Sequence, residues 1–495
     1  MMNILDRKSF FLLAIMALLF TLSSISLPTG AQEEFREHEF VENGTPHITA
    51  DPNLSVKVVA EGLDLPTTMA FLGPNDILVL EKDKGTVQRV VDGKVSSLPL
   101  LDVSVANSVE RCMCGIAVSK QSSATYVFLY YTEINGADGD DRQGKQPAGN
   151  RLYRYELVNN KLVSPKLLLD LPAYPGPRHN GGAIVIGPDN NLYITIGDVD
   201  GSFKKTDSET ETQNYNSGGK PDGRSGILRV TQDGQPVGEG ILGNEMPLRL
   251  YYAYGIRNSF GIGFDPVTGK LWDSENGPGD SDEINLVEPG FNSGWQEVQG
   301  LSSMENGFDP TSLVDFGGKG KYREPELVWQ NTAGPTSVAF LNTDKYGSNY
   351  QNDMFVGDVH NGRIYHFDLT QDRTHLILNG PLASKLIKNS KMEGLNQIIF
   401  GEGFGGITDI KVGPDGYLYV VSIGLGKIFK IIPSASDSSG ATSSKQSSIN
   451  SSGKNPIENS AVEVKKGSSI AKNESTNVPT TSNVPESKVP GNPFG

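Results

Sequence analysis

Polar and apolar positions alternate along this chain in paired runs that are separated by turns rich in glycine and proline. One phrase recurs four times: an apolar run, a turn with proline, and a second alternating run. Its copies read MAFLGPNDILVLE, IVIGPDNNLYIT, IGFDPVTGKLWDS and IKVGPDGYLYVVS, with prolines at Pro74, Pro188, Pro266 and Pro414. Alternation with period two on both sides of such a turn is typical of two antiparallel strands. Each phrase therefore predicts a β-hairpin.

A third alternating run follows most of these hairpins after a turn glycine. It reads GTVQRV from Gly85, GILRV from Gly226, GRIYHF from Gly362 and GKIFKI from Gly426. Each unit thus contains three or four strands, with no helical period between units. A sheet this small cannot bury both of its faces alone, and stacking of neighbouring sheets around an axis buries them. The pattern predicts an all-β chain folded as a β-propeller of small antiparallel sheets.

Glycine content and net charge agree with an all-β protein and limit its partners. The 495 residues include 57 glycines and carry a formal net charge of −15. The glycine content suits a fold with many tight turns. Phosphate binding needs concentrated Lys and Arg, and the chain has no basic stripe, so we expect no nucleic-acid partner.

The N-terminal segment has the layout of an export signal. Arg7 and Lys8 precede an apolar run over about residues 10–22, and small residues follow up to Ala31. This order of charged, apolar and small residues is typical of a signal peptide, which we predict at 1–31. The apolar run is short for a membrane span, although retention as a membrane anchor stays an alternative. We expect an extracytoplasmic protein, secreted or held at the cell surface.

The C-terminal segment differs from the rest of the chain in composition. From about Ser434 onward it is rich in Ser, Thr, Asn, Pro and Lys and has almost no aromatic residues. Such a segment cannot bury enough apolar surface to offset the entropy of ordering it. We therefore predict a disordered tail at 434–495, after an N-terminal extension at 32–52 and a propeller at 53–433.

Cys112 and Cys114 are the only cysteines of the chain. Residues two apart on a strand lie near the upper Cα separation for a disulfide, so a bond between them would be strained. Two thiolates without further cysteines also make a poor metal site. We expect two small apolar side chains packed in a blade, with a strained redox pair as the alternative.

Two of the six histidines stand in turns where a ligand could reach them. His179 lies in PGPRHNGG, just before a predicted strand, and the glycines after it would let a large flat ligand approach the backbone. His360 lies in the turn of FVGDVHNGRIYHF, where a histidine is usually only solvated. From its context, His179 is the stronger candidate for a functional role.

A polar segment extends from Tyr254 to Trp295. Arg257 and Asn258 follow a glycine at a predicted strand start, a position that in a propeller can face the central channel. Carboxylates follow on a glycine-rich loop: Asp273, Glu275, Asp280, Asp282 and Glu283. Oxygen ligands of this kind suit Ca²⁺, and a solvated acidic loop is an equal alternative.

Together these motifs resemble the soluble quinoprotein glucose/sorbosone dehydrogenase family, which includes the aldose sugar dehydrogenases that depend on pyrroloquinoline quinone (PQQ). The resemblance rests on HNGG with GPD, LY and GD after it, on YGIRNSFG, on SENGPGDSDEINLVEPGFNSGW and on DIKVGPDGYLYVVS, in this order within residues 58–432. It implies a six-bladed β-propeller of four-stranded antiparallel sheets. It also implies PQQ and Ca²⁺ as cofactors, a sugar substrate and an external electron acceptor.

The resemblance gives roles to residues at matching positions. His179 matches the base that removes the proton from the C1 hydroxyl of the sugar while hydride passes to the quinone. Arg257 and Asn258 match residues beside the quinone, where a fixed positive charge stabilises the developing alkoxide. Gly277 and Pro278 match the backbone carbonyl ligands of the Ca²⁺ that polarises PQQ.

A second, structural Ca²⁺ is implied less directly. Glu283 falls where some members of the family hold such an ion. Ser293 occupies a place where those members often have tyrosine. Glu283 is therefore predicted as a metal ligand in a set that differs from the family pattern.

Three positions depart from the family in a way that affects cofactor binding. PQQ carries three carboxylates, which the family usually neutralises with a lysine and two arginines, whereas this chain has His360, Gly406 and Thr408 there. Burial of carboxylates without cationic partners is unfavourable by several kcal/mol. His360 and Thr408, with Asn258, are still the predicted cofactor-binding residues. Other cations can compensate, and the candidates are Lys411, Arg178 and Arg224.

Two functions from different classes follow. The first is an exported PQQ- and Ca²⁺-dependent dehydrogenase that oxidises the anomeric carbon of aldoses to lactones. The second is a cell-surface propeller of the same descent that has lost PQQ and binds carbohydrate or protein. Retention of His179, Arg257 and Asn258 favours the enzyme, and the absent carboxylate partners favour the binding protein.

Overall fold

The computed structural model describes residues 44–135, 141, 146–199 and 209–434. The predicted signal peptide and nearly all of the predicted tail lie outside the described residues, and so does most of the predicted N-terminal extension. Within the described part of the chain, no helix is long and apolar enough to cross a membrane. The predictions of export and of a disordered tail therefore stay predictions.

The described residues fold into six β-sheets, each of which is one blade of a propeller. The first blade contains β3 (Pro66–Gly73), β4 (Asp76–Glu81), β5 (Thr86–Val91), β6 (Lys94–Val95) and β7 (Leu101–Asp102). The second contains β8 (Met113–Lys120), β9 (Thr125–Ile134), β10 (Pro147–Val158) and β11 (Lys161–Leu171). The third contains β12 (Ile184–Ile186), β13 (Leu192–Ile196), β14 (Gly226–Val230), β15 (Tyr251–Tyr254), β19 (Phe291–Asn292) and β20 (Lys321–Tyr322).

The remaining three blades come from the second half of the chain and from the two strands nearest its N-terminus. The fourth contains β16 (Ser259–Phe264), β17 (Leu271–Glu275), β18 (Asp282–Val287), β21 (Leu327–Trp329) and β25 (Leu386–Ile387). The fifth contains β22 (Pro335–Phe340), β23 (Met354–Asp358), β24 (Ile364–Phe367), β26 (Ile399–Glu402) and β1 (His47–Ile48). The sixth contains β27 (Ile407–Val412), β28 (Leu418–Ser422), β29 (Lys427–Pro433) and β2 (Leu54–Glu61).

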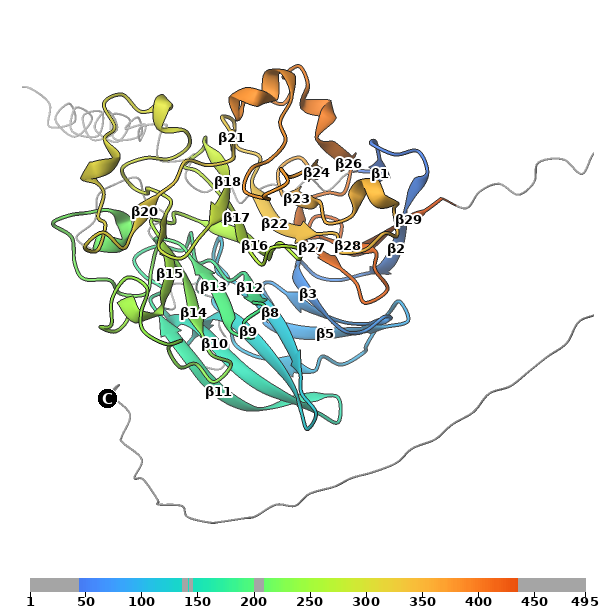
Figure 1. The fold of residues 1–495 in the computed structure, drawn as a ribbon. Helices are drawn as coiled ribbons and strands as arrows, with labels where there is room; N and C mark the ends of the chain where they lie inside the picture. Colours follow the sequence, from blue (N-terminus) through green and yellow to red (C-terminus); the bar gives the residue numbers. More distant parts are fainter. Residues whose placement is uncertain (1–43, 136–140, 142–145, 200–208, 435–495) are drawn as a thin grey trace, which may run out of the picture. The chain divides into compact units, whose positions relative to one another are not determined.

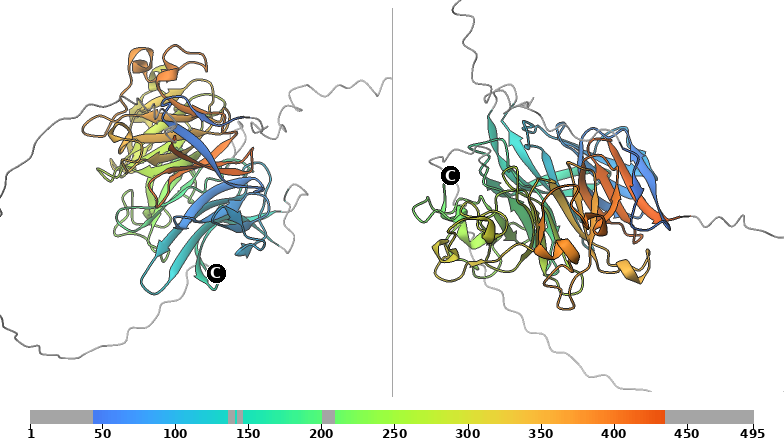
Figure 2. Two further views of the ribbon diagram at one scale, coloured as in Figure 1. Left: turned by 90° about the vertical axis from the view of Figure 1, so that its right-hand side faces the viewer. Right: turned by 90° about the horizontal axis from the view of Figure 1, so that it is seen from above.

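The first strands of the six blades form a closed ring. In chain order these inner strands are β3, β8, β12, β16, β22 and β27, and each contacts the next, with β27 contacting β3. Figure 1 shows the six labels around one centre. The ring is closed by β2, which pairs with β29 from the other end of the fold, and Figure 2 shows the blue and red-orange segments side by side. Closure of this kind leaves only short edges exposed.

The predicted six-bladed propeller is confirmed, and the prediction of four antiparallel strands per blade holds for two blades. The second and sixth blades have four antiparallel strands. Other blades add short outer strands, and three of these additions pair in parallel: β15 with β19, β19 with β20, and β21 with β25. These short strands come from long connections that pack against the outer edges of the sheets.

The four repeated phrases all form hairpins between the first two strands of a blade. They are β3–β4, β12–β13, β16–β17 and β27–β28. The equivalent hairpins of the second and fifth blades, β8–β9 and β22–β23, lack the phrase. Their turns, QSSA and a longer segment over residues 341–353, contain no proline, which explains why the repeat identified four units.

Close packing between inner strands requires glycine at two facing positions. A Cβ on Gly115 of β8 would lie 1.9 Å from the carbonyl oxygen of Gly182, and a Cβ on Gly182 would lie 2.5 Å from the Cβ of Cys114. Of the two glycines after His179 that were predicted to let a ligand approach, Gly182 therefore contacts protein, whereas Gly181 lines the central cavity. The close approach at Gly182 places the segment before β12 against β8.

The prediction of two separate cysteine side chains is wrong. Cys112 and Cys114 form a disulfide, with their Cα atoms 5.1 Å apart. Cys112 lies in a bend before β8 rather than on the strand, so the Cα separation falls within the range that a disulfide spans. Both cysteines line the central cavity.

Candidate active site

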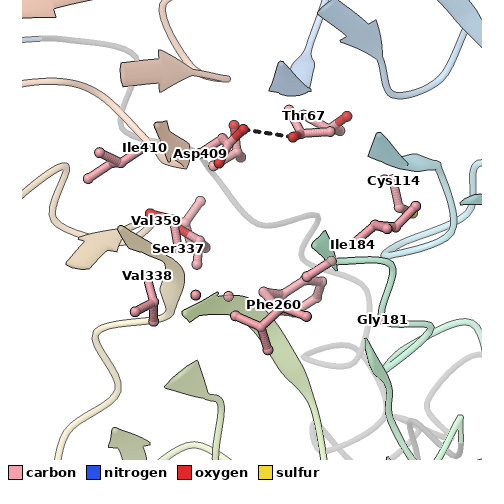
Figure 3. Close-up of a pocket in the computed structure, with 18 of the residues that line it drawn as sticks. Thr67, Cys114, Gly181, Ile184, Phe260, Ser337, Val338, Val359, Asp409 and Ile410 are labelled. Atoms are coloured by element: carbon pink, nitrogen blue, oxygen red, sulfur yellow. Dashed lines mark hydrogen bonds between the residues drawn. The ribbon is translucent and has the colours of Figure 1, made fainter. Parts of the chain in front are cut away.

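A cavity of about 790 Å³ runs along the centre of the ring. All six inner strands line it, and Figure 3 shows Thr67, Cys114, Ile184, Phe260, Val338 and Ile410, one from each of them. The ends of the inner strands contribute apolar side chains: Phe71, Ile186, Phe264, Phe340 and Val412. The beginnings of these strands and the turns beside them contribute most of the polar ones. Most side chains that can bind a polar ligand or exchange a proton with it therefore lie at one end of the cavity, called the polar end below.

His179 stands at this polar end and is paired with Asp198. The His179 Nδ1 atom lies 2.6 Å from Asp198 Oδ1, and both side chains are buried. The other carboxylate oxygen of Asp198 accepts a hydrogen bond from Trp295 Nε1 at 2.9 Å. Because Nδ1 donates to the carboxylate, the lone pair of neutral His179 lies on Nε2. The arrangement suits a side chain that accepts a proton from a ligand.

The backbone of His179 is held in an uncommon conformation by Glu110. His179 has a φ of 60°, in the left-handed region, and its N–H donates to Glu110 Oε2 at 2.6 Å. The same oxygen accepts from Asn258 Nδ2 at 3.2 Å. A non-glycine residue in this region costs about 1–3 kcal/mol and persists only where its surroundings fix it. One carboxylate oxygen of Glu110 therefore links the backbone of His179, before the third blade, to the side chain of Asn258, before the fourth.

Arg257 and Asn258 line the cavity, as the sequence predicted for a strand start in a propeller. The Arg257 guanidinium donates from NH1 to the carbonyl oxygens of Asn276 and Gly277, at 2.6 and 2.8 Å. Burial lowers the pKa of Arg257, and the nearby carboxylates of Asp198 and Glu110 oppose this shift.

Two buried polar atoms at this point have no hydrogen-bond partner among the described residues: Arg257 Nε and Asn258 Oδ1. Buried polar groups are nearly always paired, so orphaned atoms beside a cavity indicate a ligand that pairs with them. The two atoms are one donor and one acceptor, so a polar ligand that both donates and accepts would suit them. The predicted cofactor-binding role of Asn258 fits this geometry.

The predicted calcium ligands Gly277 and Pro278 also line the cavity, directly after β17. The carbonyl oxygen of Gly277 already accepts a hydrogen bond from Arg257. A carbonyl oxygen has a second lone pair, so it can bind a cation, but the guanidinium beside it repels one. These residues fit the predicted Ca²⁺ only if Arg257 turns toward a negatively charged ligand when the ion binds.

Most of the acidic segment is not a solvated loop, and of its five carboxylates only Asp280, in the turn between β17 and β18, is exposed. Asp273 and Glu275 lie on β17 and Glu283 lies on β18, and each of the three is at most 1% exposed. Burial raises the pKa of Glu275 to about 7, and it raises the pKa values of Asp273 and Glu283 well above their usual range. The loop interpretation placed these residues wrongly because the alternation along β17 and β18 is hidden by their polar side chains.

The hydrogen-bond partners of these three carboxylates differ. Ser293 Oγ donates to Glu275 at 2.7 Å and lies 3.3 Å from Glu283 Oε2. Neither oxygen of Asp273 has a hydrogen-bond partner among the described residues. Ionised carboxylates are strongly destabilised by burial unless a cation accompanies them, and Ca²⁺ takes ligands of this type. Among the described residues, the one group of three His, Cys, Asp or Glu side chains whose ligand atoms lie within 4.8 Å of one another is Asp353, His366 and Asp368, so the second Ca²⁺ at Glu283 stays a prediction.

The opposite wall of the cavity holds the positions that depart from the family. His360 and Thr408 line the cavity, so the predicted cofactor-binding residues lie at it. Thr408 Oγ1 donates to the carbonyl oxygen of Pro66 at 3.0 Å. Arg224, a candidate for replacing the missing cations, does not line the described cavity. It is buried and donates to Asp222 Oδ2 at 2.9 Å.

Sequence reasoning missed three residues that hold the polar end together. Asp198 directly follows the hairpin partner of β12, so it ends at the same edge as His179, and this register was a usable signal. Trp295 was seen only as the end of a motif. Glu110 lies 69 positions from His179, and nothing in its local pattern indicates the contact.

Comparison with known proteins agrees with this architecture. The glucose/sorbosone dehydrogenase family profile matches residues 63–430. Aldose sugar dehydrogenase YliI of Escherichia coli is 24% identical over 391 residues, which cover 78% of this chain and 94% of that protein. Quinoprotein glucose dehydrogenase B of Acinetobacter calcoaceticus is 29% identical over 301 residues, which cover 58% and 61%.

The fold is shared with a solved enzyme. The PQQ-bound structure of an aldose sugar dehydrogenase from Streptomyces coelicolor has a TM-score of 0.55 and 23% identity, and the match covers 78% of this chain and 99% of that one. The ring of inner strands, the polar end of the cavity and the profile match over most of the folded residues lead to one conclusion. The chain belongs to the glucose/sorbosone dehydrogenase family.

Proposed function

We propose that this protein is a PQQ- and Ca²⁺-dependent sugar dehydrogenase that oxidises the anomeric carbon of aldoses to lactones. The observation that carries the proposal is the His179–Asp198 pair beside Arg257 at the polar end of the cavity. A protein that only binds carbohydrate does not need a histidine whose Nδ1 proton is held by a carboxylate so that Nε2 can accept another proton. The family includes enzymes named for aldose and glucose oxidation, which supports the substrate class.

His179 acts as the base in this proposal. Its Nε2 accepts the proton of the C1 hydroxyl while C1 loses a hydride, so the hydroxyl becomes the lactone carbonyl. When bound, PQQ supplies the acceptor for the hydride and, after reduction, passes electrons to an external acceptor. Asp198 holds the imidazole in the required tautomer and stabilises its charged form once the proton arrives.

Arg257 and Asn258 position the reacting groups. Both residues line the cavity, and Arg257 Nε and Asn258 Oδ1 have no hydrogen-bond partner among the described residues. A buried guanidinium that turns from the Gly277 carbonyl to the ligand would stabilise negative charge that develops on an oxygen. Gly277 and Pro278 would hold the Ca²⁺ through their carbonyl oxygens, and Glu275, Glu283 and Asp273 would hold the structural one.

The proposal includes the place where the enzyme works. The charged, apolar and small-residue order of residues 1–31 supports export, so we propose an extracytoplasmic enzyme. Cell fractionation followed by N-terminal sequencing tests this part, because cleavage after Ala31 would give a mature chain beginning at Gln32.

The decisive experiment is calorimetric titration of the full chain with PQQ in the presence of Ca²⁺, followed by dye reduction with a panel of aldoses. Saturable binding with reduction that depends on the sugar is the expected result. Absence of PQQ binding would reject the quinoprotein function and favour a propeller that binds carbohydrate or protein instead. The His179→Ala variant is the matched control, because it should bind PQQ and reduce no dye.

A further inference from the structure

The charges that line the cavity favour an anion, although the whole chain is acidic. Among the described lining residues, four are Lys or Arg and two are carboxylates. The cations are Lys82, Arg178, Arg257 and Lys411, and the carboxylates are Glu110 and Asp409. A cavity with this balance attracts a ligand with several negative charges, and its low dielectric strengthens the attraction.

Of the two positions where the resemblance implies arginine, Gly406 is closely packed and Thr408 carries no charge. A Cβ on Gly406 would lie 3.1 Å from the carbonyl oxygen of Val359 and 3.1 Å from Ile423 Cγ2. Val359 and Ile423 therefore fill the space beside Gly406. Thr408 directs its hydroxyl to the Pro66 carbonyl. The charge for a polyanionic cofactor has to come from other strands.

Lys411 provides such a charge from β27. Its ammonium lies 3.4 Å from Asp409 Oδ2 and 3.5 Å from Thr68 Oγ1, and its side chain is 31% exposed. Asp409 does not depend on this contact, because Thr68 Oγ1 and the Met69 N–H donate to the same oxygen at 2.7 and 3.0 Å. Lys411 can therefore turn to a ligand and leave a satisfied carboxylate behind.

Lys82 provides a second charge from the turn after β4. Its ammonium donates to Asp83 Oδ1 at 2.8 Å and to the Asn107 carbonyl at 3.2 Å, and its side chain is 12% exposed. An ammonium has three donor hydrogens, and these contacts use two. The backbone of Lys82 is fixed as well, because its carbonyl accepts from the Met113 N–H of β8 at 3.0 Å. The Lys82 ammonium is therefore held where the first and second blades meet.

The two lysines stand on either side of β3. This strand contacts both β27 and β8, and it presents Thr67 and Thr68 to the cavity. We propose that Lys82 and Lys411, on either side of β3, bind the carboxylates of the cofactor in place of the lysine and arginines of relatives. The inference rests on the proposed function, since it names the residues of the same site that hold the anionic edge of PQQ.

Equilibrium binding of PQQ tests this inference without any turnover. The full chains of wild type, Lys82→Met and Lys411→Met are titrated calorimetrically with PQQ and Ca²⁺ at two salt concentrations. Each variant should bind about 10- to 100-fold more weakly, the loss expected for one charge-assisted hydrogen bond. The affinity of the double variant should also depend less on salt, because fewer charges attract the ligand.

Matched controls separate charge at the cavity from charge in general. Lys84→Met removes a lysine from the same turn whose side chain is 53% exposed, and it should leave the affinity unchanged. Thr408→Arg in the Lys411→Met background should restore affinity by returning a cation to the wall. Thermal unfolding of each variant shows that its fold is kept.

The outcomes distinguish the two proposals. If wild type binds PQQ and both lysine variants bind it as tightly, the lysine assignment is overturned and the proposed function stands. If wild type binds no PQQ, both are rejected. If only one lysine variant weakens binding, the assignment of the other lysine is wrong.

Discussion

The two sides of the cavity follow the family pattern to different degrees. On the side of the third and fourth blades, His179, Arg257 and Asn258 match the family and are joined by Asp198 and Glu110. On the side of the fifth, sixth and first blades, the family's cations are absent, and lysines on neighbouring strands line the cavity instead.

The proposed function accounts for this difference. Proton transfer requires a base within hydrogen-bond reach of one hydroxyl, in one tautomer, so its residues cannot move to other strands. Attraction of carboxylates depends on distance more than on direction, and a lysine has a long, flexible stem. Cations can therefore change position around a cavity during divergence, whereas the base and its orienting carboxylate cannot.

The largest effect is expected from His179→Ala. Removal of the base should lower kcat for sugar oxidation by about 10³-fold, within the range for general base catalysis, and should leave PQQ affinity nearly unchanged. Dye reduction at saturating sugar measures the first quantity and calorimetry the second. Turnover at the wild-type rate would show that His179 is not the base. Loss of PQQ binding would show that the side of the cavity with His179 also contributes to cofactor affinity.

Asp198→Asn should lower kcat by about 100-fold through the tautomer of His179. Trp295 Nε1 needs an acceptor, so the oxygen of the introduced amide would turn to Trp295 and its NH₂ group would face Nδ1. Nε2 would then carry the hydrogen and could not accept one. KM and PQQ affinity should change little, because neither depends on the tautomer.

Trp295→Phe supplies the test that a merely structural role would not pass. Without the indole N–H, the oxygen of the amide introduced by Asp198→Asn can turn back to His179, so the double variant should be more active than Asp198→Asn alone. The phenyl ring keeps an aromatic surface under Arg257, whose guanidinium lies 5.3 Å from the Trp295 ring centre. Equal activity of the single and double variants would contradict the tautomer argument.

The fold could be predicted from the sequence because its determinants are local. The alternation and the turns over Pro74, Pro188, Pro266 and Pro414 specify hairpins whatever the rest of the chain does. The second blade was not identified and the fifth only through GRIYHF, which forms β24, since their hairpin turns lack the phrase. Their presence follows from geometric closure, which no local pattern encodes.

Residues of the candidate site could be predicted only where they belong to a recognisable sequence motif. His179, Arg257 and Asn258 were found and lie together at the cavity. Glu110 and Lys82 were not found, because their positions depend on how the first and second blades stack. The Cys112–Cys114 disulfide was missed for a similar reason, since the bend before β8 that brings the two residues together has no signature in ERCMCGIAV.

Calcium should stabilise the fold of the protein, and the effect should grow with pH. Burial raises the pKa of Glu275 from 4.5 to about 7, so between these values the native state binds more protons than the unfolded state. Metal-free stability therefore falls as pH rises through this window. Ca²⁺ binds the ionised form, and at 100 times its dissociation constant it should add about 2.7 kcal/mol to the free energy of unfolding.

Denaturant unfolding at pH 5 and pH 8, with Ca²⁺ and with a chelator, measures this effect. Glu283→Gln should abolish the calcium dependence, whereas Glu288→Gln, one residue beyond the end of β18 and exposed, should retain it. A calcium effect that is equal at both pH values would contradict a site made of the buried carboxylates. Because Glu283 does not line the cavity, its loss should spare PQQ binding at low temperature.

The smallest effect, and the sharpest test of the difference between the two sides, is expected from His360→Lys. This substitution returns the family's lysine to a position that lines the cavity, and it should tighten PQQ binding by about 10-fold. If Lys411 already serves the same carboxylate, the gain should be larger in the Lys411→Met background than in wild type, because the two cations would otherwise share one partner. Equal gains would place them at different carboxylates. No gain in either background would mean that residue 360 does not face the cofactor. The fifth blade would then contribute no residue to the binding of its carboxylates.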